Sequence, residues 1–205
     1  MHKTNENESN SMIHLWNILK KDARLNELVS EIENAIACFK DDERNTDLRN
    51  NVIFRQFADK LLTEEERAHY YSLPEGCRMR ENAKILYLEN LKCGEFVNIN
   101  EGAILDASGG LEIGSHTSIG NGVYVWTHTT YQANLAMANH IKSPLNTRAP
   151  VKIGNGCFIA GPSVINPGVT LGDRTVVLPM SYVSKSFKGN CIISGNPATI
   201  LWEID

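Results

Sequence analysis

The fold of this chain is decided by residues 151–183, which read VKIGNGCFIAGPSVINPGVTLGDRTVVLPMSYV. Within the chain, aliphatic residues recur at every sixth position in two series: Ile153, Ile159, Ile165, Leu171, Val177 and Val183, and earlier Ile113, Ile119 and Val125. An α-helix cannot keep every sixth residue on one face, because it has 3.6 residues per turn. A coil of three short strands can do so, with each aliphatic about 4.8 Å from its counterpart in the next coil. We therefore predict a parallel β-helix with about eighteen residues in each coil.

A second inward position and a set of tight turns support this prediction. The residue four places after each aliphatic is small or β-branched: Thr117, Val123, Cys157, Ser163, Val169, Thr175 and Ser181. Turn pairs such as Asn121-Gly122 and Asn155-Gly156 mark corners, because glycine accepts positive φ at little cost. Scattered strands in a sandwich are the alternative, but they have no reason to keep an exact spacing of six.

The β-helix is expected to span residues 83–205, with two irregularities. Ile85, Leu91, Val97 and Ala103 also step by six, but the series then slips by four residues before Ile113. A gap of 28 residues separates Val125 from Ile153, so we predict an extruded loop over residues 126–150. Long loops inside a compact repeat are usually functional, and this loop is therefore where we expect the site.

The N-terminal part has a different pattern. Residues 1–10 are polar and are expected to be disordered, whereas residues 11–76 are expected to be α-helical. One apolar stripe at helical spacing is formed by Leu25, Leu28, Val29, Ile32, Ala35, Ile36 and Phe39, and a second helix is indicated by Val52, Ile53, Phe57, Leu61 and Leu62. Thr63 and Glu66 have the spacing of a capping box that opens a third helix. Pro74 and Gly76 then end the helical part.

Composition excludes several classes of function. The 205 residues carry a net charge of −4 without a dense Lys/Arg cluster, which argues against nucleic-acid binding. No apolar stretch approaches the roughly 18 residues of a membrane span, and the N-terminus lacks a secretory signal. The five cysteines form no C-x-x-C pair and suit reduced thiols. We therefore expect one main cytoplasmic domain with an appendage.

Three segments between Ile104 and Ile204 match a known family in its own order. They read ILDASGGLEIGSHTSIGNGVYVWTH, APVKIGNGCFIAGPSVINPGVTLGDRTVV and GNPATI. This half of the chain resembles the hexapeptide-repeat acyltransferases, especially the branch of galactoside, maltose, nodulation-factor and capsular-polysaccharide O-acetyltransferases. The resemblance implies a left-handed β-helix, although ordinary parallel crossovers are right-handed. It also implies a homotrimer that binds acetyl-coenzyme A in the groove between neighbouring subunits.

The resemblance assigns the catalytic position to His128, just before the loop. A histidine with a pKa near 6.5 can accept the proton of a hydroxyl as the oxygen attacks a thioester. A polar surface residue is the alternative. His116 is expected to face outward with a structural role. A metal site like that of the γ-class carbonic anhydrases is not expected, because the close H-x-x-x-x-H pair of that family is absent.

The family's cofactor contacts map onto several positions here. The resemblance places an oxyanion donor at the amide of Ala160 or Gly161, and it places the following residues beside acetyl-coenzyme A: Phe158, Pro179, Met180, Ser181, Ser184, Lys185 and Lys188. Ordinary surface charge is the alternative for the lysines. Phe158 stands where tryptophan is frequent, and Pro179-Met180 replace a small Ala-Gly pair. Thr199 and Trp202 replace basic residues that often hold the nucleotide phosphates.

Four residues are expected on the acceptor side. Asp106 resembles an acceptor-side polar position, where its carboxylate would bond a sugar hydroxyl or orient the imidazole; a corner residue that caps backbone amides is an equal alternative. Trp126 and Tyr131 would stack on a pyranose, or else anchor the loop by packing. His140 would contact the acceptor or remain solvated.

Taken together, these features predict transfer of acetyl from acetyl-coenzyme A to a hydroxyl of a sugar or surface-polysaccharide unit, without metal. An amino-sugar N-acetyltransferase of the same architecture is the first alternative. A non-catalytic trimeric scaffold is the second, and the presence of His128 argues against it. Serine acetyltransferases also join helices to such a coil, but their Asp-His signature before the first coils is missing.

Overall fold

The computed structural model describes residues 21, 26, 27, 30, 60, 62–139 and 143–205. The chain forms two compact units, residues 1–58 and 59–205. In the first unit the described residues are helical. Several predictions lie outside the described residues: the whole apolar stripe, the second helix up to Leu61, the disorder of residues 1–10, and His140.

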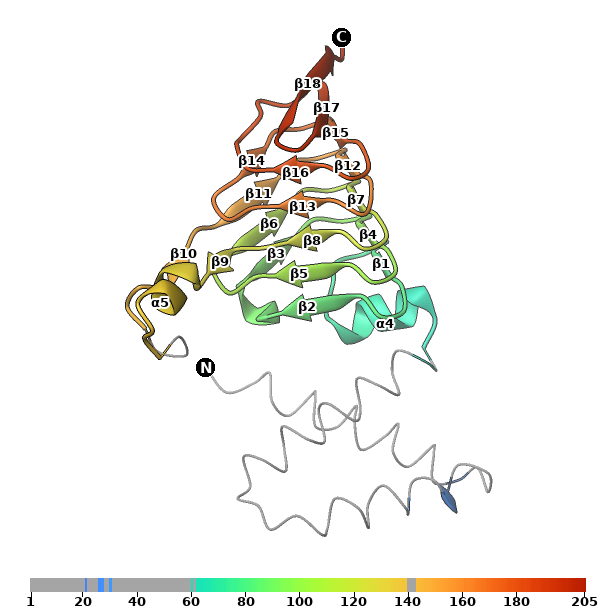
Figure 1. Cartoon of the computed structure of the whole chain (residues 1–205). Helices are drawn as coiled ribbons and strands as arrows, with labels where there is room; N and C mark the ends of the chain where they lie inside the picture. The colour runs from blue at the N-terminus through green and yellow to red at the C-terminus, as the bar shows by residue number, and fades with distance from the viewer. Residues whose placement is uncertain (1–20, 22–25, 28–29, 31–59, 61, 140–142) are drawn as a thin grey trace. The chain divides into compact units, whose positions relative to one another are not determined.

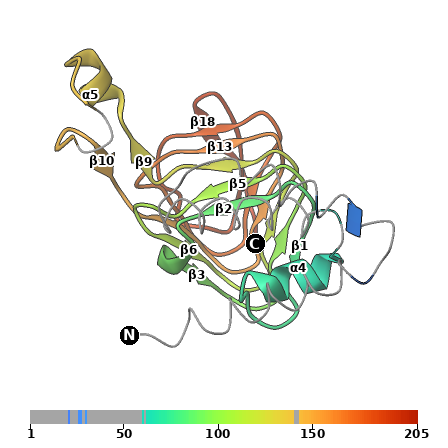
Figure 2. The same cartoon turned by 90° about the horizontal axis from the view of Figure 1, so that it is seen from below.

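Residues 78–203 wind into a β-helix whose coils stack along one axis (Figure 1). The first four coils each contribute one strand to each of three faces, which Figure 2 shows from below, and the last coils have no strand on face C. Face A contains β1 (Arg78–Met79), β4 (Asn98–Ile99), β7 (Ser118–Ile119), β12 (Phe158–Ile159), β15 (Thr175–Val177) and β17 (Cys191–Gly195), all parallel, and is closed by the antiparallel β18 (Ala198–Glu203). Face B contains β2 (Lys84–Leu86), β5 (Ile104–Asp106), β8 (Tyr124–Val125), β13 (Val164–Ile165) and β16 (Tyr182–Val183). Face C contains β3 (Leu91–Cys93), β6 (Leu111–Ile113), β11 (Val151–Ile153) and β14 (Thr170–Leu171).

The interior is filled by the predicted aliphatic stacks. On face A, Ile119 lies in register with Ile99 below it and Ile159 above it, and all three are at most 1% exposed. The nine aliphatic residues of the two regular series are all buried, as are the seven small residues of the second inward position. The prediction of a β-helix is therefore confirmed.

The predicted register of the aliphatic residues in the first coils is wrong. Cys93, not Leu91, lies in register with Ile113, and Ile99 rather than Val97 carries the aliphatic position on face A. The reason is a two-residue enlargement of the corner between faces B and C, before β3, where residues 88–90 form the 3-10 helix η1 (Leu88–Asn90), and again before β6. These coils have twenty residues, as from Ile99 to Ile119, whereas the predicted eighteen holds only further along the chain.

Truncation of a stacked aliphatic should destabilise the β-helix strongly. We expect Ile159→Ala to lower the free energy of unfolding by about 2–5 kcal/mol, because it leaves a cavity between two coils. Val176→Ala, on the outward side of face A, is the matched control and should cost less than half as much. Urea denaturation followed by circular dichroism measures both, and equal effects would contradict the stacked interior.

Helix α4 (Glu64–Tyr70) precedes the first coil and begins with the predicted capping box. The Glu66 amide donates to the Thr63 hydroxyl at 3.3 Å, and the Thr63 amide donates to the Glu66 carboxylate at 2.8 Å. Arg67 is buried, and its guanidinium donates to the carbonyl of Met79 at 2.6 Å, which ties the helix to β1. Among the residues that the structure describes, no helix has the length and apolar character needed to cross a membrane.

The described residues between 128 and 148, most of the predicted loop, form an arm that projects from the edge between faces B and C (Figures 1 and 2). Its stem is an antiparallel pair, β9 (His128–Thr129) and β10 (Thr147–Arg148), in which His128 is the register partner of Arg148. Beyond the stem lies the short helix α5 (Tyr131–Leu135). The arm therefore begins at the predicted catalytic residue.

Candidate active site

The centre of the site is a hydrogen-bonded pair, Asp106 and His128. Asp106 ends β5 and His128 begins β9, one coil further along the chain. The His128 Nδ1 atom lies 2.7 Å from the Asp106 Oδ2 atom. The carboxylate is fully buried, whereas the imidazole is about one-third exposed. A buried carboxylate is thus hydrogen-bonded to an imidazole at the surface of the β-helix.

Asp106 is surrounded by donors from both coils. Its Oδ2 accepts the backbone amide of Thr127 at 2.9 Å, and its Oδ1 accepts the amide of Ser108 at 3.0 Å. The Thr127 hydroxyl lies 3.0 Å from Oδ2, and the Ser108 hydroxyl lies 3.1 Å from His128 Nδ1. Asp106 therefore caps backbone amides and orients the imidazole at once. The carboxylate has no exposed surface in the single chain, which favours the expected role of orienting the imidazole, and a bond to a sugar hydroxyl stays a prediction.

These contacts decide the protonation of Asp106. Burial by itself raises the pKa of the carboxyl, but the hydrogen bonds from His128, Thr127 and Ser108 outweigh it and lower the pKa to about 2. The carboxylate is therefore ionised at neutral pH and can only accept hydrogen bonds. The proton of a neutral imidazole then lies on Nδ1, and Nε2 is left without a proton.

Acid should lower the free energy of unfolding, because Asp106 becomes protonated. The carboxyl titrates near 3.9 in an unfolded chain and near 2 in the folded protein. Because the folded pKa is the lower one, ionised Asp106 stabilises the fold above about pH 4, and this contribution, roughly 2 kcal/mol, is lost between about pH 4 and 2. Urea denaturation of the wild type and of Asp106→Asn should show the difference in unfolding free energy moving by about this amount over that range. A difference independent of pH would contradict the assignment.

Aromatic side chains lie beside the imidazole. The Trp126 ring meets the His128 ring edge to face at 6.5 Å, and it stacks on Tyr124 at 6.0 Å. Tyr124 and Trp126 are both partly exposed at this edge of face B. Tyr131 opens helix α5 on the arm and is 57% exposed. Trp126 therefore adjoins the imidazole directly, whereas Tyr131 lies further out on the arm.

The residues predicted to contact coenzyme A fall on three different edges. The edge between faces A and B carries Ala160, Gly161, Pro179 and Met180, with Phe158 beside it on face A. The edge between faces B and C carries Ser184 and Lys185 together with His128, and Lys188 lies on the third edge, between faces C and A. The structure of one chain therefore groups Lys185 with His128 but places the Ala160 group across face B from them.

The residues predicted to contact coenzyme A near Ala160 differ in what their amides and side chains already bind. The Ala160 amide already donates to the Val177 carbonyl at 2.8 Å, within the ladder of face A. A Cβ atom added to Gly161 would lie 1.7 Å from the Asn121 carbonyl oxygen, so only glycine fits there. Met180 and Phe158 are 74% and 50% exposed, whereas the Ser181 hydroxyl is buried and donates to the Leu178 carbonyl at 2.6 Å. Ser181 therefore does not present its side chain at the surface.

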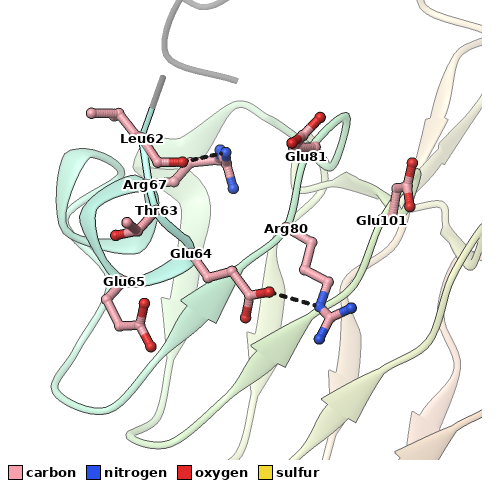
Figure 3. Close-up of a pocket in the computed structure, with 8 residues that line it drawn as sticks. All are labelled: Leu62, Thr63, Glu64, Glu65, Arg67, Arg80, Glu81 and Glu101. Atoms are coloured by element: carbon pink, nitrogen blue, oxygen red, sulfur yellow. Dashed lines mark hydrogen bonds and ion pairs between the residues drawn. The ribbon is translucent and has the colours of Figure 1, made fainter. Parts of the chain in front are cut away.

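Hollows elsewhere on this unit are distinct from the His128 pair. One, of about 510 Å³, lies where α4 meets the lower coils and contains none of the predicted site residues (Figure 3). Four glutamates and two arginines contribute to its lining, and Glu64 pairs with Arg80 at 3.1 Å. A neighbouring hollow of about 210 Å³ is lined by Arg80 and by Phe158 at its upper end.

Ser108 and Thr127 are site residues that sequence reasoning missed. With eighteen residues in each coil, Ser108 would lie beneath Trp126. The register of β5 and β8 shows instead that stacked positions are twenty residues apart here, which places Ser108 beneath His128. The signal available in the sequence was the four-residue slip of the aliphatic series before Ile113, because it equals two such two-residue enlargements.

Comparison with known proteins places the chain in a family, although no family model matches the sequence. Over 152 residues it is 31% identical to a proposed acetyltransferase of Dictyostelium discoideum, covering 74% of this chain and 78% of that protein. The chain belongs to the hexapeptide-repeat acyltransferases. It is also 32% identical over 126 residues to WcaF of Escherichia coli K12, a proposed colanic acid biosynthesis acetyltransferase, covering 61% of this chain. That match spans 65% of WcaF, slightly less than two thirds of its length.

Solved structures of hexapeptide-repeat acyltransferases share the fold. A galactoside acetyltransferase in complex with coenzyme A superposes with a TM-score of 0.64 at 22% identity, covering 82% of this chain and 86% of that one. A hexapeptide-repeat acetyltransferase of Vibrio cholerae in complex with acetyl-coenzyme A gives a TM-score of 0.58 at 23% identity, covering 74% and 83%. At these identities the likeness establishes the architecture alone.

Proposed function

We propose that this acyltransferase moves the acetyl group of acetyl-coenzyme A to a hydroxyl of a sugar or surface-polysaccharide unit, with His128 as general base. The observation that carries the proposal is the His128–Asp106 pair, in which a buried carboxylate 2.7 Å from Nδ1 leaves Nε2 at the surface as a base. The names of two relatives support the choice of substrates. WcaF is a proposed colanic acid biosynthesis acetyltransferase, and a galactoside O-acetyltransferase of Escherichia coli K12 is 41% identical to this chain over 56 residues.

The proposed reaction is a direct attack on the thioester. Nε2 of His128 removes the proton of the acceptor hydroxyl as its oxygen bonds to the acetyl carbonyl carbon. The carbon–sulfur bond then breaks, and the coenzyme A thiolate takes the proton back from His128 and leaves as the thiol. Asp106 stays ionised throughout and stabilises the imidazolium that forms between the two proton transfers.

The negative charge on the carbonyl oxygen needs a fixed donor. We propose the Gly161 amide for this role, because the Ala160 amide is already used in the ladder of face A. The neighbouring surface suits the pantetheine arm of coenzyme A, since Met180 and Phe158 expose apolar area and Gly161 lets the ligand lie close to the coil. Lys185 is proposed as a point charge for the phosphates.

Trp126 and the arm are proposed to hold the acceptor. Trp126 meets His128 edge to face, so a pyranose stacked on the indole would present a hydroxyl near the imidazole. Tyr131 and His140 are proposed as further acceptor contacts from the arm.

We further propose that the β-helix is left-handed and trimerises through face B, so that each site forms between two subunits. The outward positions of face B are mostly apolar: Ile104, Tyr124, Val164 and Tyr182. Face C instead carries a charged ladder in which Glu112 pairs with Lys92 at 3.2 Å and Lys152 at 3.1 Å, as expected of a solvated surface. With face B toward a threefold axis, the edge carrying His128 would face the neighbour's edge carrying Gly161.

Trimer formation predicts the effect of a charge on face B. We expect Val164→Glu to convert a trimer into monomers and to abolish acetyl transfer, because it buries a charge in an apolar interface. Thr170→Glu, on the outside of face C, should leave both unchanged. Sedimentation velocity measures the outcome; an active Val164→Glu monomer would contradict shared sites.

The activity itself is tested by release of coenzyme A across a panel of hydroxyl and amino sugars. Release with hydroxyl sugars supports O-acetylation, whereas release with amino sugars alone would replace it by the N-acetyltransferase alternative. Calorimetry with acetyl-coenzyme A tests the scaffold alternative, which predicts that the donor does not bind.

A further inference from the structure

We infer that Ser108 and Thr127 are positioning residues that lock His128 in the tautomer with its proton on Nδ1. The inference rests on the proposed role of His128, because only that tautomer leaves Nε2 free to accept a proton. Neither residue touches the exposed side of the imidazole; both act through the atoms that surround Nδ1.

Thr127 fixes the carboxylate from inside the coil. Its side chain is fully buried, and its hydroxyl lies 2.8 Å from the Asp106 carbonyl oxygen and 3.0 Å from Asp106 Oδ2. The same hydroxyl accepts the Gly109 amide at 2.8 Å, so its single proton must go to Asp106. The Thr127 amide donates to Oδ2 as well, at 2.9 Å. Oδ2 is therefore held in place for one further donor, which is His128 Nδ1.

Ser108 completes the assignment of protons. Its hydroxyl lies 3.1 Å from His128 Nδ1, while its amide holds the other carboxylate oxygen, Oδ1, at 3.0 Å. Nδ1 also lies 2.7 Å from Asp106 Oδ2, and the ionised carboxylate has no proton to give and must accept. Because the ring proton is then on Nδ1, the Ser108 hydroxyl cannot donate to this atom and faces it as an acceptor. Both neighbours of Nδ1 are thus acceptors, and a neutral ring carries its proton there.

Loss of either hydroxyl removes one of these constraints. Without the Ser108 hydroxyl, Nδ1 keeps a single acceptor. Without the Thr127 hydroxyl, the partly buried Gly109 amide loses its acceptor, and Asp106 loses the donor that its carbonyl oxygen and Oδ2 share, so the carboxylate is held less firmly. In both cases the tautomer with the proton on Nε2, which is inactive as a base, becomes populated.

The test combines spectroscopy with kinetics on the full chain labelled with ¹⁵N-histidine, with His128→Gln used to assign the ring signals. In the wild type at pH 8 we expect the His128 Nδ1 shift of a protonated nitrogen. Ser108→Ala and Thr127→Val should each move the Nδ1 and Nε2 shifts toward the other tautomer and lower kcat/KM about 10-fold. Thr127→Ser, which restores the hydroxyl, should return both values to within about twofold of the wild type.

A merely structural role would lower activity without moving the tautomer. The inference is overturned if Ser108→Ala and Thr127→Val keep the wild-type ¹⁵N shifts of His128, or if Thr127→Ser behaves like Thr127→Val. Ser108 is only partly buried, so Ser108→Ala tests the proposal even where Thr127→Val fails to fold. A wild type that showed no transfer to any acceptor would instead contradict the proposed function and leave these shifts interpretable.

Discussion

Replacement of His128 by Ala is expected to lower kcat/KM for acetyl transfer about 10²–10⁴-fold, the usual contribution of a general base. The side chain is one-third exposed and lies at the root of the arm, so its removal should leave the coils folded. Because the proposed base acts on the acceptor hydroxyl, affinity for acetyl-coenzyme A should stay within about twofold of the wild type. Coenzyme A release measures the first effect and calorimetry the second.

His116→Ala provides the matched control for this prediction. His116 lies on the edge between faces C and A, where its ring stacks on Phe96 at 5.0 Å, and it has no part in the proposed chemistry. We expect turnover of this variant within about twofold of the wild type. If His128→Ala retained comparable turnover, the imidazole would have to be removed from the mechanism.

Asp106→Asn should produce the second large effect, a loss of about 10²–10⁴-fold in kcat/KM with little change in donor affinity. Asparagine keeps the shape of the side chain but introduces an NH₂ group. If that group faces His128, it donates to Nδ1 and forces the ring proton onto Nε2, which reverses the tautomer needed for catalysis. The pH dependence of kcat/KM should show no pH between 6 and 9 at which activity recovers.

Asp173→Asn is the control for the second prediction. Asp173 also accepts backbone hydrogen bonds at a corner, from the Asn155 amide at 2.7 Å, but it lies on the edge between faces C and A. It should lose stability without losing turnover per folded molecule. Comparable kinetics for the two variants would show that Asp106 has only the capping role.

The fold was predictable because the six-residue spacing is a direct consequence of stacking. Ile153, Ile159 and Ile165 must each occupy the interior of a face, and no other architecture keeps that interval. The first coils were misplaced because a corner can lengthen without changing the interior, as at residues 88–90. The spacing of aliphatic residues indicates where the strands lie. The length of a corner depends instead on local backbone conformation, such as the left-handed Tyr87 that precedes that 3-10 helix.

The site was predictable in part. The resemblance singled out His128, and the structure places Asp106 against it, one of the roles expected of that carboxylate. Thr127 and Ser108 were missed because their contacts cross between coils and depend on a register that differs from the assumed one by two residues. Lys188 was grouped with Lys185 by proximity in sequence, yet the intervening residues cross face C and place the two lysines on different edges.

The stem of the arm separates positions that the packed interior constrains from positions that it does not constrain. Since β9 and β10 leave and rejoin the β-helix side by side, the length and sequence of the segment between them are not constrained by the stacking of the coils. Natural variation there can accumulate without disturbing the packed interior, while the imidazole stays fixed at the first rung of the stem. If the arm holds the acceptor as proposed, exchanging residues 131–146 between two related chains should exchange their acceptor preference.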